Sequence, residues 1–151
     1  MNLHLVTSDT STAWIMQAYE IHVEAQFSPW KFTTFEDCLT PPYYCVFAVE
    51  DEIVVGYAIM LEVLDEATLM DIAVKQECRG RGIGDMLLKH VLALSLHNSM
   101  VEVWLEVRES NESAIALYEK HGFYHIEIRK NYYPLANGKE NAVIMKWEKT
   151  L

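Results

Sequence analysis

Hydrophobic residues in the second half of the chain follow two different periods. Residues 101–108, VEVWLEVR, alternate apolar with polar positions, which predicts a strand with one buried face. Residues 83–94 and 112–121 place apolar side chains three or four positions apart, and this spacing predicts a helix on each side of that strand. Alternating strands and helices indicate an α/β fold.

The alternation in residues 101–108 also assigns side chains to two faces. The apolar face consists of Val101, Val103, Leu105 and Val107, and the opposite face of Glu102, Trp104, Glu106 and Arg108. Periodicity alone does not distinguish Glu106 from Glu102, because a solvated strand face explains both carboxylates. A role for either one needs a further argument.

The first half of the chain predicts strands joined by a tight turn. Apolar runs at 43–50 and 53–64 flank Asp51 and Glu52, so we expect an antiparallel hairpin, followed by a third strand at 67–74. Before the hairpin, a helix is expected between the cap cluster at 9–11 and SPW at 28–30, and a short helix over 34–39.

After the second long helix, the pattern returns to strands. We expect an apolar segment at 123–129, a loop at 131–140 (NYYPLANGKE) and a last strand at 141–147. Hairpin strands come first and strand–helix units later, which predicts a mixed sheet with helices on both faces.

Composition limits the number of domains and the class of partner. A chain of 151 residues, 51% of them hydrophobic, fits one domain spanning residues 1–151. Its start, MNLHLVTSDT, lacks a basic and apolar leader, so we expect a cytoplasmic protein without a membrane partner. A net charge of −10 disfavours direct nucleic-acid binding and favours a cationic partner, although acidity that only maintains solubility explains the charge equally well.

Cysteine and histidine spacing gives no sign of a metal site. Cys38, Cys45 and Cys78 form no CxxC pair and are odd in number, so reduced thiols are expected. The six histidines are scattered without ligand spacing. We therefore expect neither a disulfide framework nor a bound metal.

A glycine-rich turn, CRGRGIGDMLLKH at 78–90, lies between a predicted strand and a predicted helix. Glycines let the backbone approach a ligand closely, and the free N–H groups of the helix start favour an anion such as pyrophosphate. A tight turn with no ligand is the alternative. The stretch contains no GxxxxGK[ST] loop, and its glycines fit GxGxxG poorly.

The order Arg79-x-x-Gly82-x-Gly84 matches instead the (Q/R)xxGx(G/A) signature of the GCN5-related N-acetyltransferase (GNAT) superfamily. Three longer stretches, LDEATLMDIAV, VWLEVRESNESAIALYEKHGF and RKNYYPLANGKENAVIM, resemble its RimI type, the bacterial ribosomal-protein-alanine N-acetyltransferases. The resemblance covers most of residues 56–147. It implies a single-domain GNAT fold with a splayed, mostly antiparallel sheet, and acetyl transfer from acetyl-CoA to the N-terminal alanine of ribosomal protein number eighteen of the small subunit.

Acetyl transfer to an amine requires a base and an acid. An α-amino group with a pKa of about 8 must lose a proton before it attacks, and a thiolate leaving group with a pKa of about 8.5 gains one. The resemblance implies that Glu106 is the proton acceptor and Tyr118 the donor. We expect Glu106 to face the helix that carries Tyr118. Without the resemblance, a solvated carboxylate and a packed aromatic ring explain both residues.

The resemblance also implies the contacts of the coenzyme. The pantetheine arm is expected on the backbone of Ile72, Ala73 and Val74. The pyrophosphate is expected on the turn formed by Arg79, Gly80, Arg81, Gly82, Ile83, Gly84 and Asp85. Asn111 matches a coenzyme-contacting asparagine of the family, and capping of the following helix explains it nearly as well.

Peptide recognition is expected at Tyr132, Tyr133 and Trp30, by similarity to related N-terminal acetyltransferases. The chain departs from the family at this wall, because Ser28 stands where phenylalanine is usual and His22 stands where glutamate is usual. The basic N-terminal segment of a ribosomal protein would suit the acidic chain. Two alternatives remain, an acetyltransferase for another amine such as lysine or a polyamine, and a non-catalytic acyl-CoA sensor.

Overall fold

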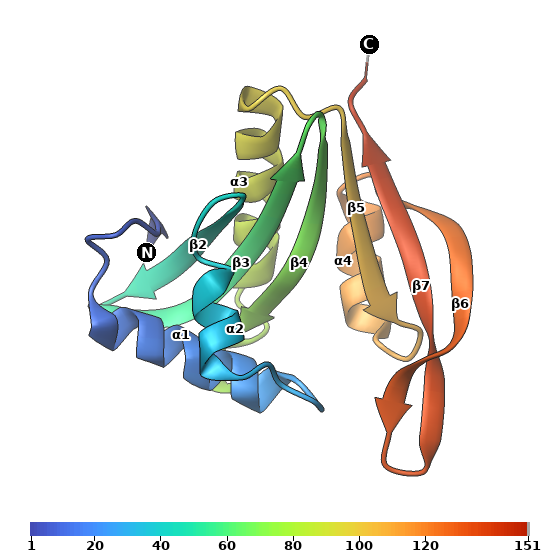
Figure 1. Ribbon diagram of the computed structural model, residues 1–151, viewed down its shortest axis with the longest axis horizontal. Coiled ribbons are helices and arrows are strands. Elements are labelled where there is room, and N and C mark those ends of the chain that lie inside the picture. The colour runs from blue at the N-terminus through green and yellow to red at the C-terminus, as the bar shows by residue number, and fades with distance from the viewer. Residues whose placement is uncertain (151) are drawn as a thin grey trace.

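A computed structural model of the chain describes residues 1–150. Its strands form one seven-stranded sheet (Figure 1). The strands are β1 (Asn2–Leu5), β2 (Tyr43–Glu50), β3 (Ile53–Val63), β4 (Glu66–Val74), β5 (Glu102–Arg108), β6 (Tyr124–Leu135) and β7 (Gly138–Glu148). Their order is β1-β2-β3-β4-β5-β7-β6, and only the β4–β5 pair is parallel. The mixed, mostly antiparallel sheet is therefore confirmed.

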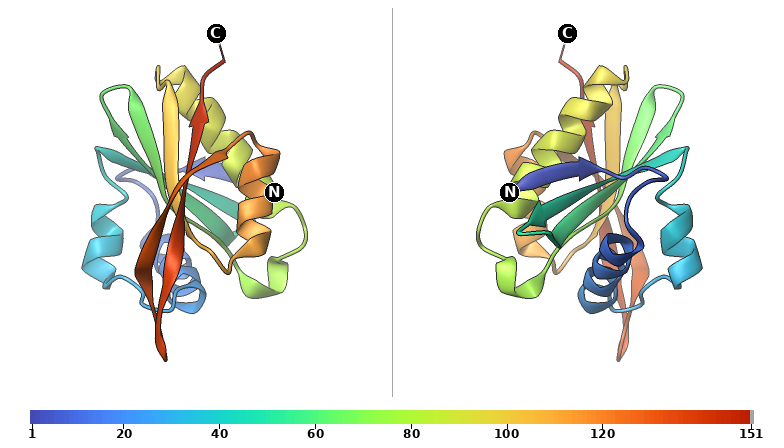
Figure 2. Two further views of the ribbon diagram at one scale, coloured as in Figure 1. Left: turned by 90° about the vertical axis from the view of Figure 1, so that its right-hand side faces the viewer. Right: turned by 90° about the vertical axis from the view of Figure 1, so that its left-hand side faces the viewer.

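Helices cover both faces of the sheet, as expected (Figures 1 and 2). They are α1 (Thr12–Ala25), α2 (Phe32–Asp37), α3 (Ile83–His97) and α4 (Glu112–Lys120), with a 3₁₀ turn, η1, at Gln76–Cys78. One core cluster joins α1 and α2 to one face, and the other joins α3 and α4 to the opposite face. Within residues 1–150, no helix is long and apolar enough to span a bilayer.

Local chemistry explains where several elements begin and end. The Ser11 hydroxyl accepts a hydrogen bond from the Trp14 N–H and caps α1. Asp51 and Glu52 both have positive φ, the backbone of a two-residue hairpin turn that matches the twist of β2 and β3. The predicted hairpin is confirmed at this point.

The sheet splits between its two parallel strands. β4 and β5 pair only from Glu66 with Glu102 to Leu69 with Leu105. Beyond these residues β4 continues to Val74 and β5 to Arg108, and the two strands diverge (Figure 1). This is the splayed sheet implied by the resemblance, and it leaves the facing backbone edges of both strands open.

The prediction of a loop at 131–140 is wrong. NYYPL belongs to β6, which pairs with β7 along a hairpin that extends beyond the sheet (Figure 1). Pro134 is tolerated because β6 is an edge strand, where a missing N–H breaks no inner ladder. The register shifts between Arg129 and Tyr133, with Asn131 at φ 53°. β1 was not predicted either, because four residues are too short for a periodic signal.

Candidate functional site

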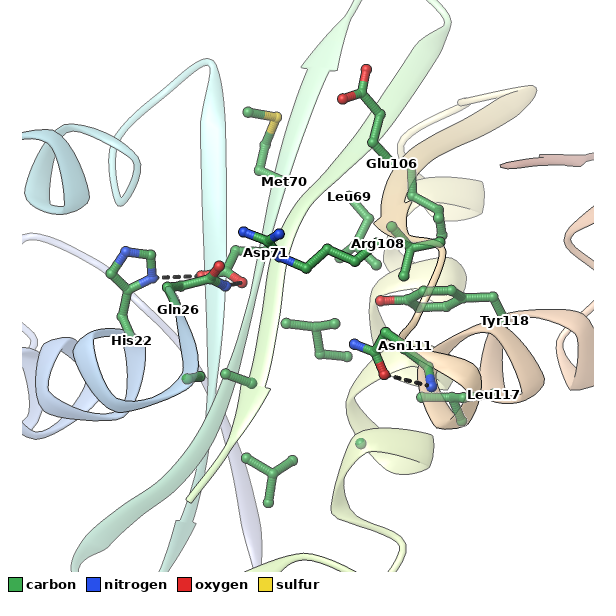
Figure 3. A pocket seen from close by; sticks show the side chains of 18 of the residues that line it. His22, Gln26, Leu69, Met70, Asp71, Glu106, Arg108, Asn111, Leu117 and Tyr118 are labelled. Carbon is green, nitrogen blue, oxygen red and sulfur yellow. Dashed lines mark hydrogen bonds and ion pairs between the residues drawn. The ribbon is translucent and has the colours of Figure 1, made fainter. Parts of the chain in front are cut away.

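A cleft of about 630 Å³ opens where β4 and β5 diverge (Figure 3). Ten of the residues expected from the sequence line it: Trp30, Ile72, Ala73, Val74, Arg79, Gly84, Glu106, Asn111, Tyr118 and Tyr133. Six others lie outside its lining: Gly80, Arg81, Gly82, Ile83, Asp85 and Tyr132. Elements far apart in the chain therefore meet at the gap in the sheet.

The end of β4 presents an open backbone edge to the cleft. Residues 71–74 pair with β3 on one side only, since the pairing with β5 ends at Leu69. The Arg79 Nε donates a hydrogen bond to the Val74 carbonyl oxygen at 3.2 Å, which places this guanidinium at the strand end. An extended, amide-containing ligand arm can pair with such an edge as an added strand does.

The glycine turn ends at a helix start with free N–H groups. Gly80 and Gly82 adopt φ of 79° and 81°, a left-handed backbone that residues with a Cβ avoid. Gly82 is the N-cap of α3 and supplies no side-chain acceptor. The first-turn N–H groups of α3 are consequently available to an anion.

Three side chains of this turn point to protein partners. Arg81 forms an ion pair with Glu50 at 2.6 Å, and Ile83 is buried in the core. Asp85 accepts hydrogen bonds at 2.8 Å from Lys120 and from His121, and these bonds lower the pKa of its carboxyl group. These side chains fix the helix start against its neighbours, so a ligand here would meet backbone N–H groups.

Glu106 carries an ion pair that the sequence did not reveal. Its Oε1 lies 3.1 Å from the Arg129 Nη1, and its side chain is 32% exposed. The Arg129 guanidinium also lies over the Tyr132 ring, 5.2 Å from its centroid. Glu106 lies on β5 and Arg129 on β6, and β7 lies between these two strands. The contact therefore depends on the strand order, for which local periodicity gives no signal.

Tyr118 and Glu106 approach the cleft from opposite faces of the sheet. Tyr118 is 6% exposed and belongs to the same core cluster as Leu105 and Val107, on the face covered by α3 and α4. Strand alternation directs Glu106 to the other face, so the expectation that it faces α4 is wrong. The Tyr118 hydroxyl points into the cleft (Figure 3), and burial raises the pKa of this phenol.

Asn111 caps α4 with one end of its amide. Its Oδ1 accepts the Ala114 N–H at 3.2 Å, as the helix-capping interpretation predicted. The amide nitrogen lies on the cleft side (Figure 3). The same residue therefore shapes the start of α4 and presents a donor to the cleft.

The outer mouth of the cleft is formed by aromatic rings around Arg108. The Arg108 guanidinium lies 4.6 Å from the Tyr133 ring centroid and 5.9 Å from that of Phe27. Its Nη1 donates to the Pro134 carbonyl and to Glu140, each at 3.0 Å. Burial raises the pKa of Tyr133 to about 12.

A buried polar network on the opposite wall also escaped prediction. Asp71, 8% exposed, accepts hydrogen bonds from His22 at 2.8 Å, Gln26 at 3.0 Å and Tyr57 at 2.5 Å. A carboxylate inside the apolar run LMDIAV was the available signal, because such a group is rarely buried without partners. The described part of the chain holds no cluster of three or more metal-ligating side chains.

Comparison with known proteins agrees with this architecture. The model of the acetyltransferase (GNAT) family matches residues 10–123. The chain belongs to the GNAT family. The [ribosomal protein bS18]-alanine N-acetyltransferase of Salmonella typhimurium is 43% identical over 141 residues, which are 93% of this chain and 92% of the relative. The resemblance to the RimI type is thereby confirmed, and the chain is an acetyltransferase.

Solved structures of GNAT proteins share this fold. The crystal structure of the ribosomal-protein-S18-alanine N-acetyltransferase from Escherichia coli matches with a TM-score of 0.89 and 35% identity, covering 99% of this chain and 96% of that one. A GNAT family acetyltransferase from Elizabethkingia anophelis with acetyl-CoA bound has a TM-score of 0.79 and 23% identity, over 98% and 97% of the two chains. The second likeness concerns the fold alone.

Proposed function

We propose that this GNAT protein transfers acetyl from acetyl-CoA to the α-amino group of the N-terminal alanine of ribosomal protein bS18. The observation that carries the proposal is the cleft through the sheet, which brings a carboxylate from one face and a phenol from the other to a single opening. The names of the full-length relatives support the substrate. A ribosomal protein substrate also supports a cytoplasmic site of action.

On the α3 and α4 side, the residues present fit acetyl-CoA. The open edge of Ile72–Val74 suits the pantetheine amides, and the uncapped start of α3 at Gly82 suits the pyrophosphate. Arg79 at the end of β4 adds a positive charge, and the amide nitrogen of Asn111 adds a donor. The coenzyme supplies the activated acetyl group, and these residues bind and orient it.

On the other face, the cleft fits an extended peptide. Trp30 lines one wall and Tyr133 the other, and Glu106 lies on the face between them, on β5. We assign Trp30 and Tyr133, together with Tyr132, to peptide recognition. Charge supports a basic segment as the ligand, because the chain carries a net charge of −10.

The chemistry follows from the two proton transfers. Glu106 accepts a proton from the α-amino group, and the free amine nitrogen attacks the thioester carbonyl in a ternary complex. The new C–N bond forms while the C–S bond breaks, and the thiolate takes a proton from Tyr118. The second proton that the nitrogen loses as it becomes an amide restores the phenol of Tyr118. A tyrosine is protonated at neutral pH, and burial, which raises the pKa of Tyr118 further, keeps its hydroxyl in the form that can donate.

The test is an assay of thiol release with acetyl-CoA and a peptide that carries the alanine N-terminus of bS18. Mass spectrometry should place the acetyl group on the α-amino nitrogen, and the same peptide with a blocked N-terminus should not react. Acetyl on a lysine side chain would favour the other-amine alternative. Coenzyme binding without turnover on any amine would favour the sensor.

A further inference from the structure

We propose that Asp71 and His22 form a positioning pair that fixes the peptide wall of the cleft to the cofactor strand. The inference rests on the proposed function, since it assigns the wall to the peptide substrate. Asp71 lies on β4, next to the open backbone edge at Ile72–Val74. His22 lies near the end of α1, directly before the segment that leads to Trp30.

The hydrogen bonds of His22 fix its tautomer. The Trp30 backbone N–H donates to the His22 Nε2 at 2.9 Å, so this nitrogen carries no proton. The His22 Nδ1 is therefore the donor to Asp71 Oδ2, at 2.8 Å. A single ring connects the backbone of the wall to a carboxylate of β4, and both side chains are buried.

Two further contacts fix the same wall. Gln26, the residue that follows α1, donates from Nε2 to Asp71 Oδ1 at 3.0 Å. The Tyr19 hydroxyl donates to the Trp30 carbonyl at 2.7 Å, and the His22 ring packs against the Trp30 ring with centroids 4.7 Å apart. Trp30 is thus bound through its N–H, its carbonyl and its ring.

The location of these residues distinguishes positioning from general stabilisation. His22, Gln26, Trp30 and Asp71 all line the cleft. Tyr57 donates to the same carboxylate, and its hydroxyl also lies 3.0 Å from the His22 Nδ1, but it makes no contact with Trp30 in this network and lies on β3, outside the cleft lining. The carboxylate therefore has two partners in the wall and one behind it, which provides a matched control.

The pair should act on the peptide and not on the coenzyme. His22→Leu removes the acceptor for the Trp30 N–H, and Gln26→Ala removes one contact from a half-buried position that tolerates truncation. We expect the KM for the bS18 peptide to rise about tenfold in His22→Leu and about threefold in Gln26→Ala. The KM for acetyl-CoA and kcat should stay within twofold. Tyr57→Phe should lower the Tm and leave both KM values within twofold.

Hydrogen exchange at the Trp30 amide provides a readout that needs no substrate. Exchange should accelerate in His22→Leu and remain at the wild-type rate in Tyr57→Phe, because only the first variant removes the partner of that N–H. If His22→Leu does not fold, Gln26→Ala decides the kinetic question. Equal KM increases for both substrates, or an unchanged peptide KM together with unchanged Trp30 exchange, would overturn the positioning pair. Absence of wild-type turnover with the exchange pattern intact would instead reject the proposed function.

Discussion

The two faces of the sheet surround their candidate catalytic groups in opposite ways. On the α1 and α2 face, Glu106 is partly exposed and pairs with Arg129. On the α3 and α4 face, Tyr118 is buried among apolar side chains. The first environment leaves Glu106 accessible to an incoming ammonium group, and the second shelters a thioester sulfur from water.

The split in the sheet allows groups on opposite faces to reach the same cleft. Side chains on opposite faces of a continuous sheet are separated by its backbone. Because β4 and β5 part after Leu69 and Leu105, the cleft reaches both faces and includes both Glu106 and Tyr118 in its lining.

Replacing Glu106, the proposed base, should have the largest effect. Glu106→Gln keeps the size of the side chain but cannot accept the amine proton, so we expect kcat to fall by about 10²–10⁴-fold at neutral pH. The KM for acetyl-CoA should not change, because that ligand is assigned to the other face. Thiol-release kinetics measure both values. Glu102→Gln, on the same strand face but outside the cleft lining, is the matched control and should keep wild-type kcat.

Removing the phenolic hydroxyl should have a smaller effect. Tyr118→Phe leaves the ring packed against Phe123 and deletes only the proposed proton donor, so we expect kcat to fall by about 10–100-fold. A thiolate can leave without full protonation, which limits the loss. Tyr124→Phe, on exposed β6, removes a surface hydroxyl and should leave kcat unchanged. An unaltered rate in Tyr118→Phe would refute the assigned acid.

The raised pKa of Tyr118 gives the same variant a pH signature. Above pH 10 an unfolded tyrosine loses its proton, whereas the buried Tyr118 keeps it, so the folded state binds more protons and stability falls as pH rises. Urea unfolding between pH 9 and 11 should show a shallower decline for Tyr118→Phe than for the wild type. Parallel declines would show that burial does not suppress ionisation at this site.

Local patterns predicted elements better than they predicted partners. The strand at 43–50 and the starts of the helices at 83 and 112 agree with the structure, because apolar periodicity and capping residues are short-range signals. The Arg129 partner of Glu106 and the Asp71 partner of His22 depend on the order of strands in the sheet. Long-range pairing of this kind leaves no periodic trace in the sequence.

The NYYP segment shows how a local signal misleads. Asn131 and Pro134 are turn formers, and they suggested a loop. In the structure the irregular stretch is absorbed as a register shift within an edge strand, and Tyr132 and Tyr133 project from a hairpin. Of the two, Tyr133 lines the cleft and Tyr132 does not, and the local pattern gave no sign of this difference.

A change at the glycine turn should weaken only the coenzyme side. Gly82→Ala forces a Cβ into a φ of 81° at the N-cap of α3 and disturbs the first-turn N–H groups. We expect the KM for acetyl-CoA to rise about five- to tenfold while the KM for the peptide stays within twofold. Gly138→Ala, also at positive φ and with open space around its Cβ, controls for backbone strain and should change neither KM. A larger effect of Gly82→Ala on the peptide KM would contradict the assignment of the two faces.

Salt should produce the smallest effect, and only the KM for the peptide should rise. A basic peptide is attracted to a chain of net charge −10, so raising NaCl from about 0.05 M to about 0.5 M should raise its KM about two- to threefold. Acetyl-CoA is itself anionic and is repelled by the same net charge, so screening should leave its KM unchanged or lower it slightly. A peptide with its basic residues replaced by glutamine should lose the salt response. If both KM values rise together, short-range ion pairs at the cleft and not the long-range field govern the approach of the substrates.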